Sequence, residues 1–291
     1  MSAISQLEVF QSMNASPNAR LERCAELGDG LSAAIWSNSH DARDYHAPSH
    51  HTLSCYLNDG TGTFRRGAPG SKGAPDKLCV MPAGAESAWI VNGDIRLAHL
   101  YIGQEQFALG CIRLLDREPR ELQLHERTFL DDPQQAARFR QLVKLDWHEP
   151  GERIRTSTLA HDLIDHLLLN QVGLREGLKL KGGLAPVMRR RVAEYIEQRL
   201  DQPLSLGELA MQTALSEYHF ARMFRESFGM PPHQYVLARR VALAQRLLRD
   251  TRQPLSQVAL ACGFSSASHF ANRFRSVVGG TPGEYRQAFE E

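Results

Sequence analysis

The sequence predicts an α+β chain of two domains: an amino-terminal β-barrel followed by an all-α domain with two helix-turn-helix units. Three observations carry this prediction. Short apolar stretches alternate with glycine-rich breaks over residues 33–121, helical periodicity begins near residue 133, and one pattern is written twice within residues 203–286. A chain of 291 residues with 42% hydrophobic content is long enough to bury two cores.

The repeat is the strongest of these signals. Six residues return 50 positions later (274 − 224 = 50), as Phe220, Phe224, Arg225, Gly229, Pro232 and Tyr235, and then as Phe270, Phe274, Arg275, Gly279, Pro282 and Tyr285. Each copy predicts two short helices joined by a tight turn, which is the geometry that places a second helix in the major groove of DNA.

Capping residues mark the helices of the first unit. Ser205, with Glu208 three residues later, predicts a capping box that opens the first helix. Ser216 is expected to cap a second helix that runs to Phe228, and Gly229 then supplies a left-handed C-cap.

The second unit repeats this plan. Ser256 is expected to cap its first helix, and the turn Cys262-Gly263-Phe264 leads to a helix that ends at Gly279. A longer helix over 233–249 joins the two units. Its length of about 25 Å would let the two second helices lie about 34 Å apart, one turn of B-DNA.

Spacing divides the second helix of each unit into two faces. Phe220 and Phe224, like Phe270 and Phe274, lie one turn apart and are predicted to be core. The other face carries side chains that suit DNA, because Arg can bond guanine and Asn can bond adenine. The candidate DNA contacts are Ser216, Tyr218, His219, Ala221, Arg222 and Arg225, and Ser266, Ala267, Ser268, His269, Asn272, Arg273 and Arg275.

Among these candidates, Arg225 and Arg275 are assigned to phosphates, because phosphate contacts outnumber base contacts in such interfaces. Arg222 and Asn272 are assigned to bases, with an ordinary solvated helix face as the open alternative.

The string over 259–286 resembles the signature of the AraC/XylS family of bacterial transcription regulators; residues 240–248 resemble its linker helix and 206–210 its first helix. The resemblance covers about residues 187–288. It implies a regulator that binds double-stranded promoter DNA, contacts RNA polymerase and activates more often than it represses. The family's base-contacting positions fall on Tyr218, Ala221 and Arg222, and on Ala267, Ser268, His269 and Asn272.

Two departures from the family pattern stand out. Ala214 occupies a turn position where glycine is frequent. Ala221 and Ala267 occupy positions where many members carry hydrogen-bonding side chains, so contact there would be apolar or absent.

Charge is divided unevenly along the chain. Residues 187–291 carry 14 Arg, no Lys and 10 acidic residues, a net charge of +4, whereas residues 1–186 carry 20 basic and 23 acidic residues, a net charge of −3. The basic part is the part with the repeat, as expected for a DNA-binding domain.

The cysteines and the amino terminus indicate the compartment. Five scattered cysteines without a C-x-x-C pair favour a reducing environment and argue against a disulfide framework or a zinc knuckle: Cys24, Cys55, Cys79, Cys111 and Cys262. Residues 1–10 lack the apolar core of a signal peptide, and no apolar run reaches about 18 residues. A cytoplasmic protein without membrane attachment is expected.

Short strands are predicted in the amino-terminal part. They include Leu53–Leu57, Leu78–Val80, Ala88–Val91 and Ile95–Leu100, and Asn92-Gly93 is a hairpin signal between the last two. Such a pattern indicates a small barrel or sandwich. Members of the family often carry a cupin-like sensor barrel here, so residues 1–125 are predicted to be a cupin-like effector-binding domain.

A small-molecule effector is expected inside this barrel, with candidate lining residues His46, His50, Glu86, Trp89 and His99. The turn 82–86 resembles that of a cupin, and His51 lies beside His50. However, Ser87 stands where a metal-binding cupin would place a histidine. No metal or other cofactor is therefore expected, and the chain is not predicted to be an enzyme.

Two other functions are alternatives to a regulator. One is a cupin-type metalloenzyme fused to a DNA-binding tail, which metal analysis would separate from a regulator. The other is alkyl-transfer DNA repair with an Ada-like organisation, which would need an amino-terminal cluster of zinc-binding cysteines that this sequence lacks.

Residues 126–172 are predicted to be helical and to dimerise the chain. Asp131 or Asp132 can cap a helix that begins at Pro133, and a second helix is expected over 156–171. The apolar stripe of that helix either packs on the barrel or forms a homodimer contact, as helices at this position do in related regulators: Leu159, Leu163 and Leu167. Residues 173–186 are predicted to be a linker to the DNA-binding domain, residues 187–291.

Overall fold

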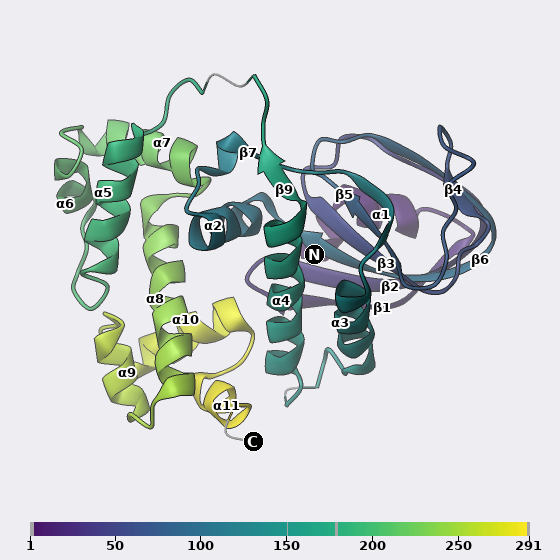
Figure 1. Ribbon diagram of the computed structural model, residues 1–291. Helices are drawn as coiled ribbons and strands as arrows, with labels where there is room; N and C mark the ends of the chain where they lie inside the picture. Colours follow the sequence, from purple (N-terminus) through teal and green to yellow (C-terminus); the bar gives the residue numbers. More distant parts are fainter. Residues whose placement is uncertain (1–2, 150, 178–179, 290–291) are drawn as a thin grey trace. The chain divides into compact units, whose positions relative to one another are not determined.

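The computed structural model describes residues 3–149, 151–177 and 180–289, and the chain forms two compact units (Figure 1). Unit 1 contains Met1–Phe107 and Leu124–Gly173. Unit 2 contains Ala108–Gln123 and Leu174–Glu291, so a short piece of the amino-terminal half belongs with the carboxyl-terminal helices.

Unit 1 is built on an antiparallel sheet with the strand order β1-β2-β6-β3-β5-β8, in which β4 also pairs with β6. Its strands are β1 (Ala19–Gly28), β2 (Leu31–Tyr45), β3 (His51–Asp59), β4 (Thr63–Arg65), β5 (Lys77–Met81), β6 (Ser87–Ile102) and β8 (Arg127–Asp131). The predicted closed barrel is wrong, because β1 and β8 end the sheet without pairing to each other in the part of the chain that the structure describes.

The predicted hairpin at Asn92-Gly93 is also wrong. The chain continues through both residues as one strand, β6, which pairs with β2 along its length. The pairing steps from Ser39 with Asp94 to Asp41 with Val91, so Asn92 and Gly93 lie opposite the single residue His40. Asn92 and Gly93 therefore form a β-bulge within β6 instead of a hairpin turn.

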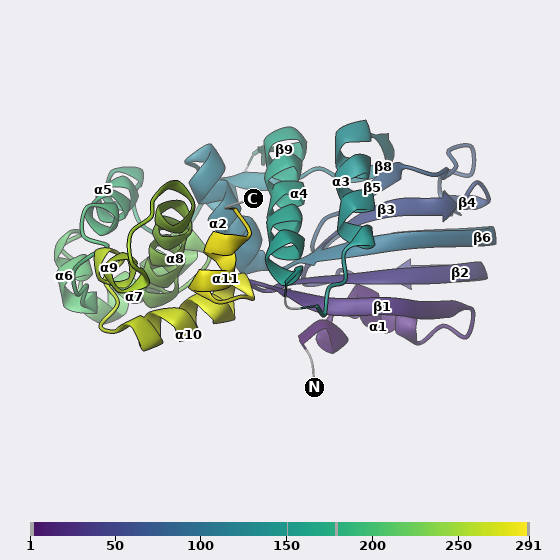
Figure 2. The same cartoon turned by 90° about the horizontal axis from the view of Figure 1, so that it is seen from below.

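Helices cover this sheet (Figure 2). They are η1 (Ala3–Gln6), α1 (Glu8–Asn14), α3 (Pro133–Lys144) and α4 (Arg153–Gln171). Another helix, α2 (Gln104–Leu115), begins after β6 and belongs to unit 2 from Ala108. Asp132 caps α3 by accepting a hydrogen bond from the backbone N–H of Gln135 at 3.0 Å, as predicted. Helix α1 was not predicted from the sequence; it packs on β1 and β2 and buries Val9, Phe10 and Met13.

The predicted dimerisation stripe on α4 is mostly buried within the chain. Leu163 and Leu167 are 0% and 2% exposed, and Leu159 is half-buried. The helix packs on α3 and β1, and Gln135 of α3 donates a buried hydrogen bond to the backbone oxygen of Leu163. Leu163 and Leu167 are therefore not available on the surface for a second copy, because packing within the chain already covers them.

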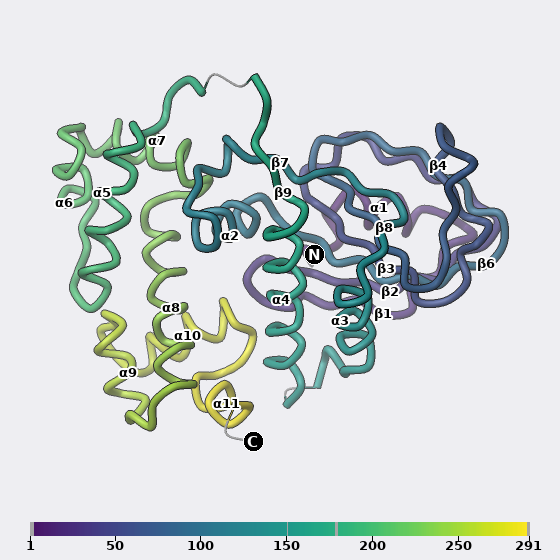
Figure 3. The backbone as a smooth tube through the Cα atoms, viewed as in Figure 1, coloured from purple at the N-terminus to yellow at the C-terminus, as the bar shows by residue number. Residues whose placement is uncertain are grey.

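Unit 2 is helical (Figure 3). Its elements are η2 (Pro119–Glu121), α5 (Pro186–Glu197), α6 (Leu206–Met211), α7 (Glu217–Phe228), α8 (Pro232–Asp250), α9 (Leu255–Ala261), α10 (Ala267–Val278) and α11 (Pro282–Gln287). Where the chain passes between the two units, β7 (Leu122–Leu124) pairs with β9 (Val172–Leu174). The chain trace shows α8 running from α7 at its start to α9 and α11 at its end. Within the predicted linker, residues 178–179 lie outside the described residues.

The segment Ala108–Gln123 packs into unit 2, which the sequence did not predict. Ala108 shares a core with Leu184, Val192 and Phe228. Glu118 is buried beside two guanidinium groups, accepting hydrogen bonds from Arg120 and lying 3.5 Å from Nη1 of Arg189.

No helix within the described ranges combines the length and the apolar character needed to cross a lipid bilayer.

Candidate nucleic-acid interface

The first helix-turn-helix unit forms as its capping residues predict. Ser205 and Glu208 make a reciprocal capping box at α6, and Ser216 caps α7 by accepting a hydrogen bond from the N–H of His219. Gly229 ends α7 in the left-handed conformation, with φ of 73°. In the turn between the helices, Ala214 also has a left-handed φ of 54°, a conformation that suits glycine better than alanine.

The second unit repeats this geometry with one difference. Ser266 caps α10, and Gly279 ends it with φ of 87°. Ser256 does not cap α9, contrary to the prediction, because α9 begins at Leu255 and Ser256 lies inside its first turn. The N-cap position is Pro254, whose backbone oxygen accepts the hydrogen bond from the N–H of Val258.

Aromatic side chains form the core of each helix-turn-helix unit, which confirms the predicted core. Phe220, Phe224, Phe270 and Phe274 are each no more than 1% exposed. Phe224 stacks on Phe228 with ring centroids 4.0 Å apart. Tyr235 and Tyr285, which correspond in the repeat, pack edge-on against Phe224 and Phe274 with centroids 5.7 and 5.4 Å apart.

The opposite face of each recognition helix, as we call α7 and α10, is open to solvent. Tyr218 is 83% exposed. Ala221 is half-buried, and the other candidate DNA contacts are exposed: Ser216, His219, Arg222, Arg225, Ser266, Ala267, Ser268, His269, Asn272, Arg273 and Arg275.

The guanidinium groups on this face are not engaged elsewhere. Arg222 and Arg225 of α7, and Arg273 and Arg275 of α10, form no ion pair with the residues that the structure describes. A cation without an internal partner can neutralise a phosphate at no cost in broken ion pairs. Both recognition helices thus offer free positive charge.

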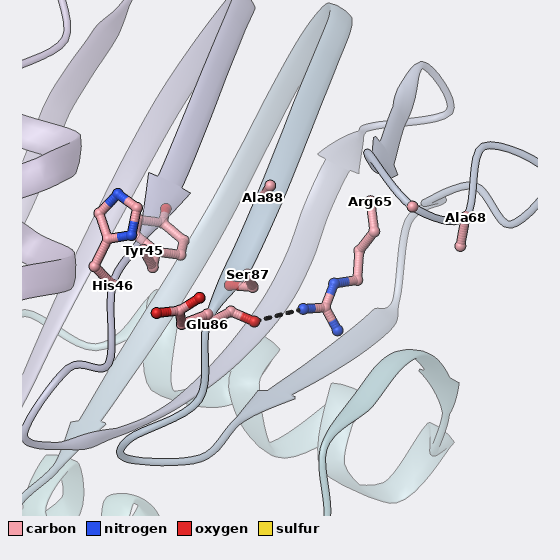
Figure 4. Close-up of a pocket in the computed structure, with 8 residues that line it drawn as sticks. Tyr45, His46, Arg65, Ala68, Glu86, Ser87 and Ala88 are labelled. Atoms are coloured by element: carbon pink, nitrogen blue, oxygen red, sulfur yellow. Dashed lines mark hydrogen bonds between the residues drawn. The ribbon is translucent and has the colours of Figure 1, made fainter.

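In unit 1, a cavity of about 450 Å³ lies where the ends of β2 and β4, with the loops that follow them, meet the start of β6 and the loop that precedes it (Figure 4). Two predicted effector contacts, His46 and Glu86, line it. Tyr45, Arg65 and Ser87 also line it and were not predicted to do so.

Arg65 is held in place at this cavity. Its Nη2 donates a hydrogen bond to the backbone oxygen of Glu86 at 3.0 Å, and its Nη1 pairs with Glu126. The guanidinium also lies 5.5 Å from the centre of the Trp89 ring. No local pattern marks Arg65 as a site residue, because its neighbours here come from strands distant in the sequence.

The other predicted effector contacts lie elsewhere. Trp89 and His99 line a second, internal hollow of only about 40 Å³, room for little more than water. Burial lowers the pKa of His99 to about 3, and its Nδ1 lies 3.2 Å from the hydroxyl of Tyr101. His50 is buried with Nδ1 3.0 Å from a carboxylate oxygen of Glu8.

The histidines of the predicted cluster do not converge on one point. Besides the His50–Glu8 pair, Nδ1 of His51 accepts a hydrogen bond from the backbone N–H of Ala83, and His46 is exposed at the outer cavity. Among the described residues, no three His, Cys, Asp or Glu side chains are grouped so as to hold a metal ion.

Comparison with known proteins places the helical half in a family. A family model described as a helix-turn-helix domain matches residues 209–288. The chain is 42% identical over 95 residues to the probable transcriptional regulator LumQ of Photobacterium leiognathi, covering 33% of this chain and 38% of LumQ. It is 35% identical over 92 residues to the HTH-type transcriptional activator AarP of Providencia stuartii, covering 32% of this chain and 68% of AarP.

A solved transcriptional regulator with an AraC-type DNA-binding domain, from Chromobacterium violaceum, is 30% identical with a TM-score of 0.34, covering 36% of this chain and 94% of that one. The chain spans well under half of LumQ, and the shared part is the helical repeat. On this repeat, the chain belongs to the AraC/XylS family of DNA-binding transcription regulators.

Proposed function

We propose that this regulator recognises a specific promoter sequence with two heads, α7 and α10, each placed in the major groove. The observation that supports this most is the repetition of one exposed face on two helices, with the same aromatic core behind each. The 19 residues of α8 span about 28 Å, which suits two heads about one turn of B-DNA apart.

Each head combines base contacts with phosphate contacts. Arg222 of α7 would bond guanine and Asn272 of α10 would bond adenine, because their planar groups can form two hydrogen bonds to those base edges. Arg225 and Arg275, one turn closer to the carboxyl ends of the helices, would hold phosphates.

Selection of binding sites from a random DNA library with the full-length protein tests this proposal. We expect a site with two contacted segments about ten base pairs apart. Arg222→Ala should relax the preference in one segment and Asn272→Ala in the other, each at a cost of about 1–3 kcal/mol.

Two control variants separate base recognition from general charge and folding. Arg191→Ala removes an exposed arginine of α5, and Gln257→Ala removes an exposed amide of α9, both outside the recognition helices. They should leave the selected sequence unchanged. Salt-dependent binding without sequence preference in the wild type would refute recognition by two heads.

We further propose that a small molecule controls DNA binding through the outer cavity of unit 1. Its volume of about 450 Å³ falls within the range of small-ligand sites, whereas the internal hollow is too small. His46 and Glu86 are exposed there and free to contact a ligand with hydrogen-bonding groups. Control of this kind requires a ligand that binds two states of the protein unequally.

Calorimetric titration with a metabolite library tests the effector proposal. A ligand that changes DNA affinity should lose binding in Glu86→Gln and His46→Ala. It should keep binding in Gln104→Ala, a change of an exposed residue that does not line this cavity. A complete library without a ligand that alters DNA binding would count against effector control.

Three further properties follow from family membership as proposals: a homodimer, contact with RNA polymerase, and activation in the cytoplasm. AarP is named an activator. Transcription from the selected site in a purified system would distinguish activation from repression, and sedimentation would measure the oligomeric state. A dimer would use a surface other than the buried Leu163 and Leu167.

A further inference from the structure

Arg240 lies at the point where the two helix-turn-helix units meet. It projects from the middle of α8, the helix that joins them, and is half-buried. Its Nε donates a hydrogen bond to the backbone oxygen of Leu200 at 3.0 Å, and its Nη2 donates one to the backbone oxygen of Gln202 at 2.6 Å. Both acceptors belong to the segment between α5 and α6, on the side of the first unit.

The turn of the second helix-turn-helix unit packs against Arg240 and Leu200. Gly263, between α9 and α10, has a left-handed φ of 70°. A methyl group there would lie 2.8 Å from Nη2 of Arg240 and still closer to the backbone oxygen of Leu200. The Leu200 carbonyl, the Arg240 guanidinium and the Gly263 backbone are therefore packed together without space for a side chain.

This contact links the two helix-turn-helix units independently of the helix that connects them. The α8 helix alone would leave each unit free to tilt about its own end, whereas a guanidinium that bonds two carbonyls has a fixed orientation. Leu200 is itself buried in the core that contains Phe220 and Phe224 of the first unit. The two hydrogen bonds therefore fix α8 against the first helix-turn-helix unit, and Gly263 packs the second unit onto that fixed guanidinium and carbonyl, so the second unit cannot tilt toward the first without displacing them.

We propose that Arg240 is a positioning residue that fixes the separation and angle of α7 and α10, so that the protein accepts only one spacing between the two DNA segments. This inference rests on the proposed recognition by two heads. Adding one base pair moves a segment by about 3.4 Å along the duplex and turns it by about 35° around the axis. A rigid pair of heads cannot follow such a change without deforming the DNA.

Binding to operators of altered spacing tests the proposal. The full-length protein would be titrated with the selected site and with duplexes in which the two segments are one or two base pairs closer or farther apart. The wild type should lose about tenfold or more in affinity per base pair of change. Arg240→Ala should bind the original spacing within a few fold of wild type and lose less than about threefold when the spacing changes.

Two further variants keep this result interpretable. Arg240→Lys retains a charge but lacks the rigid planar fork that orients two donors, so its spacing profile should be intermediate, and it serves if the alanine variant does not fold. Arg239→Ala is the matched control, because this neighbouring arginine of α8 also binds the side of the first helix-turn-helix unit, through Glu197 of α5, whereas the atoms nearest Gly263 come from Leu200 and Arg240. Its spacing profile should remain that of the wild type.

The outcomes separate the two proposals. If the affinity of the wild type and of both Arg240 variants falls equally steeply as the spacing changes, recognition by two heads is supported and the role of Arg240 is refuted. If Arg239→Ala flattens the profile as much as Arg240→Ala, a general loss of α8 packing explains the effect and the specific role is again refuted. If the wild type itself binds without preference for sequence or spacing, recognition by two heads fails, and this inference fails with it.

Discussion

Replacement of Phe224 by alanine should destabilise unit 2 selectively. Phe224 is 0% exposed and contacts Phe220, Phe228 and Tyr235. An aromatic side chain of this kind buries about 150–250 Å², which at about 25 cal/mol per Å² corresponds to about 4–6 kcal/mol. Alanine retains part of that contact, so we expect a loss of about 3–5 kcal/mol, as large-to-small core changes give.

The distribution of tryptophan provides the assay. The chain has three Trp residues, Trp36, Trp89 and Trp147, and all belong to unit 1. Tryptophan fluorescence in a urea titration therefore follows unit 1, whereas circular dichroism at 222 nm is dominated by the helices of unit 2. Phe224→Ala should move the helical transition to lower urea and leave the fluorescence transition in place.

Tyr218→Ala is the matched control on the same helix. Tyr218 is an aromatic residue that is 83% exposed, so its removal should change stability by less than about 0.5 kcal/mol. A helical transition in Phe224→Ala within about 1 kcal/mol of wild type would refute the aromatic core as the support of α7. Since domains are commonly stable by about 5–15 kcal/mol, the expected loss is easily measured.

Three further predictions concern stability. Ala214→Gly should stabilise unit 2 by about 0.5–1 kcal/mol, because relief of the left-handed alanine outweighs the added backbone entropy; unchanged or lower stability in the dichroism titration would contradict it. Burial lowers the pKa of His99 from 6.5 to about 3, so the stability that the neutral imidazole contributes to unit 1 is complete above pH 6.5 and is lost as pH falls toward 3, about 2 kcal/mol of it by pH 5. If His99→Gln lost as much stability on acidification as the wild type, measured by fluorescence, this reasoning would be wrong. Burial raises the pKa of Glu118, so the folded state binds its proton more tightly than the unfolded chain does, and the stability of unit 2 falls as pH rises above 4.5. Glu118→Gln should lack this fall. If the stability of variant and wild type changed with pH in parallel, the pKa of Glu118 would not be raised.

Much of unit 2 could be predicted because its signals are local. A cap such as Ser216 and its partner lie three residues apart, and a core pair such as Phe270 and Phe274 lies one turn apart. Such contacts form within a single helix whatever surrounds it. The exception, Ser256, shows the limit of a cap signal, because α9 begins at Leu255 after the N-cap Pro254, so Ser256 already lies inside the first turn.

The candidate sites divide in the same way. The exposed face of α7 and α10 follows from helical periodicity, so the sequence located it. The outer cavity does not, because Tyr45, Arg65 and Glu86 come from separate strands and loops that only the folded sheet brings together. The predicted pocket residues His50 and His99 were placed in the interior by the same pairing.

By itself, the sequence determined the two recognition helices, their aromatic support and the family, since each depends on spacing within a short stretch of chain. Only the tertiary structure decided that the sheet is open, that Asn92-Gly93 forms a bulge opposite β2, and that Leu163 is covered within the chain. It also decided that Ala108–Gln123 joins unit 2 and that Arg240 meets Gly263. These features depend on partners distant in the sequence, and no local pattern specifies which partner a strand edge, an apolar stripe or a guanidinium will find.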